Sequence, residues 1–371
     1  MANVLVTGGA GFIGSHLVDA LLADGHRVRV LDSLVPQVHG DGRPPHLAAD
    51  AELHVGEVGD RSAVDRALDG VSVVFHQAAE VGVGQSMYEI YRYVAGNTLA
   101  TATLLEALVE RRADLEKVVV ASSMSIYGEG AYTCDQHGKV HPPPRLTAQL
   151  EQRQWEVRCP TCGEEVRPAP TGEDKPTVPT SVYAITKQDQ ELLCLTVGRA
   201  YDIPTVALRY FNVYGTRQAL SNPYTGVCAI FSGRLLNDER PLVFEDGNQT
   251  RDFLHVSDVV QANLLAMQRP AADYEAINIG TGVATSVLEA ARLLAEGLGK
   301  NLEPEVVSRF REGDIRHCVS DITRARELLG YEPKVSLAAG MPELLDWVRG
   351  QSAADRVAQA TAELEARQLI R

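Results

Sequence analysis

Basic residues are scarce in this chain relative to acidic ones, at 35 Lys and Arg against 49 Asp and Glu, and the formal net charge is −14. Nucleic acids and anionic membranes are bound mainly through an excess of Lys and Arg, so we expect neither as the main partner. No apolar run approaches the roughly 18 residues that a membrane-spanning helix needs. The opening Met-Ala-Asn-Val-Leu-Val leads directly into an apolar strand, so we also expect no signal peptide.

Cysteine is also infrequent, with six in 371 residues, which is too few for a disulfide scaffold. This usage favours the reducing cytoplasm. No internal repeat is visible.

Short, nearly all-apolar segments alternate with helical patterns along the chain. The predicted strands are Val4–Val6, Arg27–Leu31, Val71–His76, Val118–Ser122, Thr205–Arg209 and Ala276–Ile279. The predicted helices include Ala63–Leu68, Thr98–Val109, Tyr183–Tyr201 and Val256–Met267. Strands without polar alternation are buried on both faces, so the pattern predicts a Rossmann-type, doubly wound parallel sheet.

A glycine-rich turn follows the first strand. Gly8, Gly11 and Gly14 are spaced three apart between that strand and a helix. Glycine allows the tight turn and the close approach of a pyrophosphate, and the helix N-terminus offers free N–H groups to it. Asp32 ends the second strand, where a carboxylate accepts bonds from the adenosine ribose and repels a 2′-phosphate. The turn therefore indicates NAD rather than NADP.

Tyr183 and Lys187 are four residues apart and so share one face of a predicted helix. A lysine beside a tyrosine favours the phenolate, which is then a general base for a hydroxyl proton. Ser123, at the end of an upstream strand, supplies a hydroxyl to share that proton. The alternative is that the serines cap a strand and the tyrosine only packs.

These motifs together resemble the extended short-chain dehydrogenases/reductases that act on nucleotide sugars. The resemblance rests on residues 7–14, Asp32, 76–79, Asn97, 122–128, Tyr183 with Lys187, 208–215, 251–256 and 311–314. It implies a nucleotide-sugar substrate, usually with a homodimer formed by a four-helix contact, here through the helices at 98–109 and 183–201.

The resemblance assigns roles residue by residue. The catalytic residues are Ser123, Tyr183 and Lys187. The NAD-binding residues are Gly8, Gly11, Phe12, Ile13, Gly14, Asp32, Ser33, Glu57, Val58, Gln77, Ala78, Ala79, Glu80, Asn97, Ser122, Tyr183, Lys187, Tyr210, Asn212 and Val213. The substrate-binding residues are Val81, Ser123, Met124, Ser125, Tyr183, Asn212, Arg251, Arg311 and Asp314.

Met124 and Ser125 distinguish between reactions in this family. Sugar 4,6-dehydratases carry an Asp-Glu pair directly after the catalytic hydroxyl, and this chain has no acid there. The resemblance therefore implies a 4-epimerase, an isomerase that inverts C4 through a 4-keto sugar. Within the family, the run 125–130, the Cys- and His-containing segment after it and residues 219–226 most resemble the bacterial enzymes that act on dTDP-L-rhamnose and dTDP-6-deoxy-L-talose or a related dTDP- or UDP-hexose. A ketoreductase that consumes reduced cofactor and a non-catalytic NAD-binding regulator are the alternatives.

The segment 130–179 interrupts the alternation, because it is rich in proline and has no sustained apolar period. It contains Cys134 with His137 and Cys159 with Cys162, two pairs about 20 residues apart. This spacing predicts a structural, tetrahedral zinc site in a zinc-ribbon-like insertion. Unliganded thiols or a redox pair are the alternatives.

The predicted domain organisation follows from these motifs. Residues 1–208, with 253–282 returning to them, form the NAD-binding domain, and 130–179 are the insertion. Residues 209–252 and 283–350 form the smaller α/β substrate-binding domain. Residues 351–371 are expected to form a helical tail to which the sequence assigns no chemistry.

Overall fold

The computed structural model describes residues 1–40 and 42–371. Its centre is a seven-stranded sheet in the order β14-β9-β5-β4-β1-β2-β3, and every pairing in it is parallel. The strands are β1 (Asn3–Thr7), β2 (Arg27–Asp32), β3 (Glu52–Val55), β4 (Val73–His76), β5 (Lys117–Ser123), β9 (Thr205–Tyr210) and β14 (Ala276–Ile279). The predicted fold class is confirmed.

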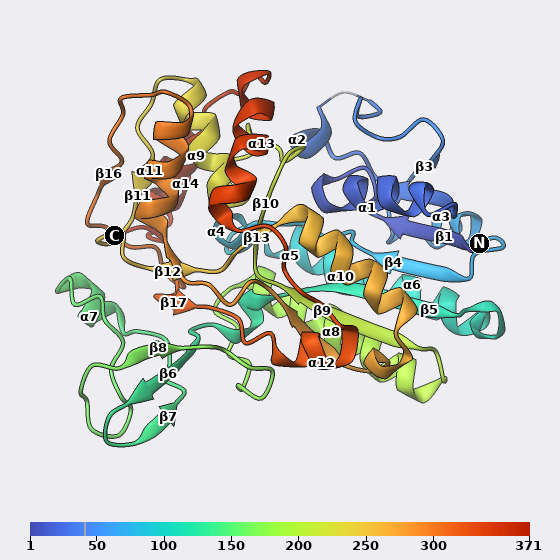
Figure 1. The fold of residues 1–371 in the computed structure, drawn as a ribbon, viewed down its shortest axis with the longest axis horizontal. Coiled ribbons are helices and arrows are strands. Elements are labelled where there is room, and N and C mark those ends of the chain that lie inside the picture. Colours follow the sequence, from blue (N-terminus) through green and yellow to red (C-terminus); the bar gives the residue numbers. More distant parts are fainter. Residues whose placement is uncertain (41) are drawn as a thin grey trace.

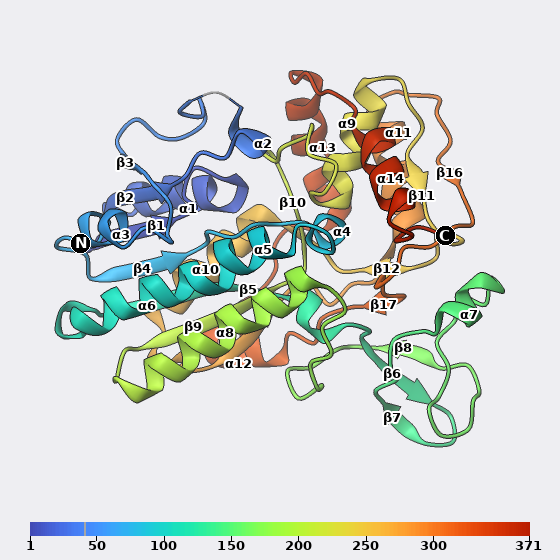
Figure 2. The same ribbon diagram turned by 180° about the vertical axis from the view of Figure 1, so that it is seen from behind.

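Helices cover both faces of this sheet. One face carries α1 (Phe12–Ala23), α10 (Val256–Gln268) and α12 (Thr323–Leu329), which share one apolar core. The other carries α3 (Arg61–Ala67), α6 (Ala100–Glu110) and α8 (Val182–Ala200), which share a second core. Figure 1 shows α1 and α10 in front of the sheet, and the turned view in Figure 2 shows α6 and α8 there. Burial on both faces explains why these strands read as continuous apolar runs.

Two elements of this part differ from the prediction. β3 was not predicted, because it lies at the sheet edge and its Glu52 and His54 break any apolar run. The predicted helix at 98–109 begins as α6 at Ala100 and is preceded by a π-helical turn, η1 (Val94–Leu99). The shorter helical elements of this part of the chain are α2 (Pro36–His39), α4 (Val83–Ser86), α5 (Ile90–Tyr93), η2 (Arg112–Asp114), η3 (Met124–Tyr127) and η4 (Pro270–Ala272).

A second layer of structure lies beyond the carboxyl ends of the strands. Its helices α9 (Val227–Leu236), α11 (Val287–Gly297) and α13 (Leu337–Arg349) enclose a third apolar core. Its strands are β10 (Asn212–Tyr214), β11 (Leu242–Val243), β12 (Thr250–Arg251), β13 (Phe253–His255), β15 (Thr285–Ser286), β16 (Glu305–Val306) and β17 (His317–Cys318). The tail forms α14 (Val357–Ala366). The domain boundaries given above stay a prediction.

The insertion projects away from the main sheet in both views (Figures 1 and 2). It forms a three-stranded sheet in the order β7-β6-β8, with β6 (Ala131–Cys134), β7 (Gly138–Val140) and β8 (Arg167–Ala169). A short helix, α7 (Thr147–Glu151), lies between β7 and β8. The cluster of buried residues here is small: Tyr132, Cys134, Val157, Cys159 and Val166.

Among the described residues, no helix combines the length and the apolar character that crossing a membrane requires.

Candidate active site and metal cluster

A cavity of about 1080 Å³ opens at the carboxyl ends of the parallel strands, between the sheet and the second layer. This is the edge at which ligands bind in open parallel sheets. Every residue predicted to act in catalysis, cofactor binding or substrate binding lines the cavity, with the exception of Asn97. The fold therefore brings together side chains that lie up to about 300 residues apart in the sequence.

The glycine turn forms one end of the cavity. Gly8 has φ of +68°, and a Cβ there would lie 2.7 Å from the Ala78 nitrogen. A Cβ on Gly14 would collide with the Gly8 carbonyl oxygen. The turn is thus closed to side chains but leaves its backbone, at the start of α1, open to the cavity. This arrangement fits the pyrophosphate of a dinucleotide.

Asp32 borders the same end and is held by the main chain. Its Oδ2 accepts from Ala10 N at 3.0 Å, and its Oδ1 accepts from Leu34 N at 2.9 Å. His39 Nε2 lies 3.5 Å from Asp32 Oδ1. These contacts orient a carboxylate beside the cavity, as a ribose acceptor requires. His39, which also lines the cavity, was not predicted.

Asn97 is fully buried and holds the loop after β4 instead of lining the cavity. Its Oδ1 accepts from Glu80 N at 2.6 Å, and its Nδ2 donates to Glu80 O at 3.1 Å. Gln77, at the start of that loop, donates to the Tyr210 hydroxyl at 3.1 Å. Asn97 therefore acts on the cavity through Glu80, and direct contact with NAD stays a prediction for this residue.

The two serines at the end of β5 make different contacts. Ser122 Oγ donates to Glu191 Oε2 at 2.6 Å, so its hydroxyl is engaged with α8. Ser123 Oγ accepts from Ser125 N at 3.1 Å and from Ser125 Oγ at 2.9 Å. Because these bonds use the oxygen of Ser123 as an acceptor, its proton remains free to donate into the cavity.

Tyr183 and Lys187 extend from the first turns of α8, which Ser181 caps by accepting from Ala184 N. Burial raises the pKa of Tyr183, and the neighbouring Ser123 hydroxyl lowers it in part. Burial lowers the pKa of Lys187 to about 8, and its Nζ donates to Gln190 Oε1 at 2.7 Å. Lys187 is therefore still mostly a cation at neutral pH. In the protein alone, therefore, burial holds the pKa of Tyr183 above its usual value, whereas the sequence suggested that Lys187 would lower it.

The far end of the cavity carries the predicted substrate residues. Asn212 Oδ1 is buried and has no hydrogen-bond partner among the described residues, so it can accept a bond from a ligand. Arg251 donates to the carbonyl oxygens of Thr250, Ile315 and Arg316 over 2.7–3.0 Å. Arg311 donates through Nε to Asp314 Oδ2 at 2.7 Å. Both guanidinium groups are thus oriented by protein acceptors at the cavity wall.

The tail contributes a wall that the sequence reading missed. Val357, Ala360, Thr361 and Leu364 of α14 line the cavity together with Ile370. The spacing of 357, 360, 361 and 364 is that of one helical face, so this signal was present in the sequence. Ile370 also pairs with Arg311 through an isolated β-bridge.

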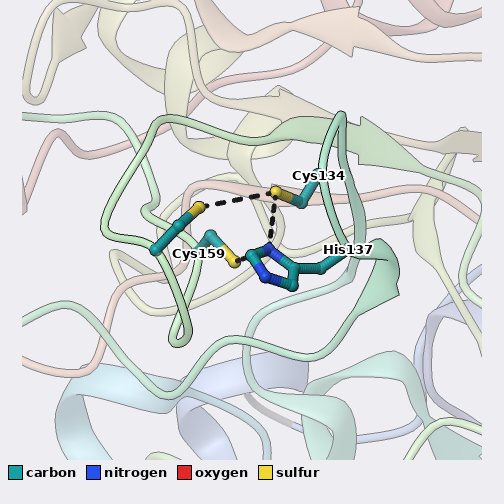
Figure 3. Close-up of side chains that lie close together, drawn as sticks. Cys134, His137 and Cys159 are labelled. Carbon is teal, nitrogen blue, oxygen red and sulfur yellow. Dashed lines mark hydrogen bonds between the residues drawn. The ribbon is translucent and has the colours of Figure 1, made fainter.

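The four predicted metal ligands converge within the insertion. Their ligand atoms all lie within 4.8 Å of one another. Cys134 Sγ is 3.7 Å from Cys162 Sγ and 3.5 Å from His137 Nδ1, and Cys159 Sγ is 3.6 Å from that nitrogen. Figure 3 shows Cys134 and Cys159 pointing at the His137 ring. The Cys134–Cys162 separation is too long for a disulfide, whose sulfurs lie about 2.05 Å apart.

Comparison with known proteins identifies the family. A model of the NAD dependent epimerase/dehydratase family matches residues 4–147 and 160–280. The dTDP-L-rhamnose 4-epimerase of Burkholderia thailandensis is 39% identical over 350 residues, 93% of this chain and 94% of that protein. The UDP-glucose 4-epimerase of Mycolicibacterium smegmatis is 36% identical over 359 residues, 94% of this chain and 99% of that one.

Solved structures agree with these relatives. The UDP-glucose 4-epimerase of Thermotoga maritima, solved with UDP-glucose, has a TM-score of 0.75 at 34% identity and covers 94% of this chain and 99% of its own. The UDP-glucuronic acid 4-epimerase of Bacillus cereus, solved with UDP-glucuronic acid and NAD, has a TM-score of 0.76 at 28% identity with the same coverage.

The family resemblance that the motifs indicated is confirmed, and so is the predicted enzyme class, since epimerases are isomerases. The chain belongs to the NAD dependent epimerase/dehydratase family, alongside the NAD-dependent nucleotide-sugar 4-epimerases.

Proposed function

We propose that this chain inverts C4 of a nucleotide-linked hexose through a 4-keto intermediate. One observation supports the proposal most strongly. Ser123, Tyr183 and Lys187 line the same cavity as the glycine turn at one end and Arg251 and Arg311 at the other. A single cavity thus combines a binding site for a dinucleotide, a proton acceptor and two cationic groups that can bind a diphosphate.

The residues of this chain then act as follows. Tyr183 takes the proton of the 4-hydroxyl, while Ser123 donates a hydrogen bond to the same oxygen. The positive charge of Lys187, one helical turn after Tyr183 on α8, favours the Tyr183 phenolate against the burial that raises its pKa. When bound, NAD supplies the acceptor and the later donor of hydride at C4. Arg251 and Arg311 keep the diphosphate in place while the keto-sugar rotates to present its opposite face.

The substrate that we propose is dTDP-L-rhamnose or its C4 epimer, with other dTDP- or UDP-hexoses as alternatives. Val81 and Met124, both apolar, line the cavity with Ser123, which suits a sugar that lacks a 6-hydroxyl. The Burkholderia relative carries that name, at 39% identity over 93% of this chain. Met124 and Ser125 also provide no acid for eliminating a 6-hydroxyl, which argues against dehydration.

The experiment is to denature the purified protein and identify the released nucleotide, and then to incubate native protein with dTDP-L-rhamnose, UDP-glucose or UDP-glucuronic acid. We expect bound NAD and inversion at C4, followed by NMR, with no cofactor supplied. Turnover that occurs only with stoichiometric NADH or NADPH would show a ketoreductase instead.

We also propose that Cys134, His137, Cys159 and Cys162 bind one structural zinc ion. Zinc–sulfur and zinc–nitrogen bonds of about 2.3 and 2.0 Å in a tetrahedron place two sulfurs about 3.8 Å apart and sulfur and nitrogen about 3.5 Å apart. The separations of 3.7, 3.5 and 3.6 Å support this set. Four protein ligands leave no open position, so the metal would hold the insertion and take no part in the reaction.

Elemental analysis tests the zinc proposal. We expect about one zinc per chain, lost in Cys162→Ser, and no loss in Cys228→Ser, which changes a buried cysteine outside the cluster. Equal zinc content in wild type and Cys162→Ser would refute the assignment.

We propose a homodimer through α6 and α8. These helices pack side by side, and α8 presents the exposed apolar residues Ile185 and Leu192 on one face. Light scattering of the purified protein would show a dimer, and Leu192→Glu would shift it toward monomer.

A further inference from the structure

A buried group of charges connects the insertion to the wall of the cavity. The side chains of Arg145 and Glu129, from the insertion and its edge, and of Glu245 are each 2% exposed. Arg316 is fully buried, and its Nη1 donates to Glu245 Oε2 at 3.0 Å. Ions removed from water are tolerated only when they are paired and hydrogen-bonded, so this group is stable only as a complete set.

Arg145 connects four other segments of the chain, since its Nη1 also donates to the carbonyl oxygen of Trp155 at 3.0 Å. Its Nη1 and Nη2 donate to both carboxylate oxygens of Glu245, over 3.0 and 2.8 Å. Its Nη2 also donates to the carbonyl oxygen of Asp314 at 3.1 Å, and its Nε lies 3.3 Å from Glu129 Oε1. The fork geometry of a guanidinium is needed to reach all four segments at once, which a lysine cannot do.

Glu129 holds the chain two residues after Asp314. Both of its carboxylate oxygens accept from the main-chain nitrogen of Arg316, over 2.9 Å. The segment 314–316 is therefore held at Asp314 by Arg145 and at Arg316 by Glu129.

This segment is also the one that orients the cavity arginines. Arg251 donates to the carbonyl oxygens of Ile315 at 2.7 Å and Arg316 at 3.0 Å. Arg311 donates to the side chain of Asp314. A shift of residues 314–316 would thus move both guanidinium groups together.

We infer that Arg145 is a positioning residue for the nucleoside diphosphate of the substrate, through its hold on residues 314–316. The inference rests on the proposed function in one respect, namely that Arg251 and Arg311 bind the diphosphate. It gives the insertion a role in substrate affinity, although the insertion projects away from the sheet.

The test compares Arg145→Met and Arg145→Lys with Arg167→Met. Arg167 belongs to the same insertion, but its side chain is 73% exposed and pairs with the exposed Asp135. The probes are dTDP and UDP, titrated by calorimetry, together with steady-state kinetics on whichever nucleotide sugar the wild type accepts. Bound NAD is measured after denaturation.

We expect Kd for the nucleoside diphosphate and KM to rise about tenfold or more in Arg145→Met, as displaced binding groups commonly cause. The constant kcat should stay within about twofold and NAD content should be unchanged, because an indirect hold on the phosphates affects binding and not the reacting atoms. Arg145→Lys should give a smaller rise and Arg167→Met none.

A purely structural role would lower the active fraction and hence apparent kcat, while Kd and KM in the folded fraction stayed as in wild type. That result would overturn the inference. Arg145→Lys, which keeps a positive charge among the buried carboxylates, decides the matter if Arg145→Met does not fold. Wild-type protein that binds neither dTDP nor UDP would instead contradict the proposed function.

Discussion

The Asn97 carboxamide donates a hydrogen bond to the Thr186 hydroxyl, with 2.9 Å between Nδ2 and Oγ1. Thr186 lies between Tyr183 and Lys187 on α8, and Asn97 also holds both main-chain groups of Glu80. A single buried amide thus connects the loop that borders the cofactor end of the cavity to the helix that carries the catalytic pair.

Asn97→Ala should lower kcat about tenfold or more and weaken retention of NAD, because it removes the partner of both main-chain groups of Glu80 and the bond to Thr186. Thr98→Ala is the matched control. The Thr98 hydroxyl donates to Asp189 Oδ2 at 2.8 Å, so Thr98 also connects η1 to α8, but it does not contact Glu80. Equal losses in the two variants would contradict the role given to Asn97.

Lys187→Met should stabilise the protein at pH 7 while it abolishes turnover. The folded pKa of Lys187 is about 8, lowered by burial from 10.5. Between pH 8 and 10.5 the unfolded chain binds more protons at Lys187 than the folded chain does, so the stability of the wild type rises with pH through that window. The cost of burying the Lys187 cation is fully present below pH 8. One pKa unit corresponds to about 1.4 kcal/mol, and the variant also loses the bond from Lys187 to Gln190. We therefore expect the free energy of unfolding to rise by about 2 kcal/mol at pH 7.

Denaturant unfolding at pH 7 and 10.5 measures this gain, which should disappear at the higher pH. Lys139→Met changes an exposed lysine paired with Asp174 and should alter stability little. A Lys187→Met variant less stable than wild type at pH 7 would contradict the account.

Removal of residues 352–371 should raise KM for the nucleotide sugar about tenfold, since it deletes a cavity wall and the β-bridge to Arg311. The tail also contacts two segments far from it in the sequence, because Glu363 accepts from the Tyr88 and Tyr224 hydroxyls at 2.9 and 3.2 Å. NAD content should be unchanged, because the glycine turn and Asp32 border the opposite end of the cavity from Arg251 and Arg311. An unaltered KM would show that the tail is dispensable for binding.

Six of the seven sheet strands were predictable because both of their faces are buried, so each reads as an apolar run. β3 was not, since an edge strand with Glu52 and His54 has no such run. The glycine turn and the Tyr183–Lys187 spacing were readable because each depends on residues that are near one another in sequence. Similarly, the four metal-type ligands lie in two short pairs.

The role of Asn97 was not readable, because its partners Glu80 and Thr186 lie 17 and 89 residues away. The same holds for Arg145, which lies in a proline-rich stretch and acts on Glu245 and Asp314, 100 and 169 residues later. Such positioning contacts depend on tertiary packing and leave no local pattern. The apolar face of α14 did leave one, at helical spacing.

The central claim is that Tyr183 is the base that opens the reaction at C4. Tyr183→Phe removes only the phenolic oxygen, so the most direct measurement is C4 inversion by NMR in this variant, alongside NAD released on denaturation. We expect turnover to fall by a factor of about 10² to 10⁴, the usual contribution of a positioned base, with NAD content as in wild type. Turnover equal to that of the wild type would contradict the account.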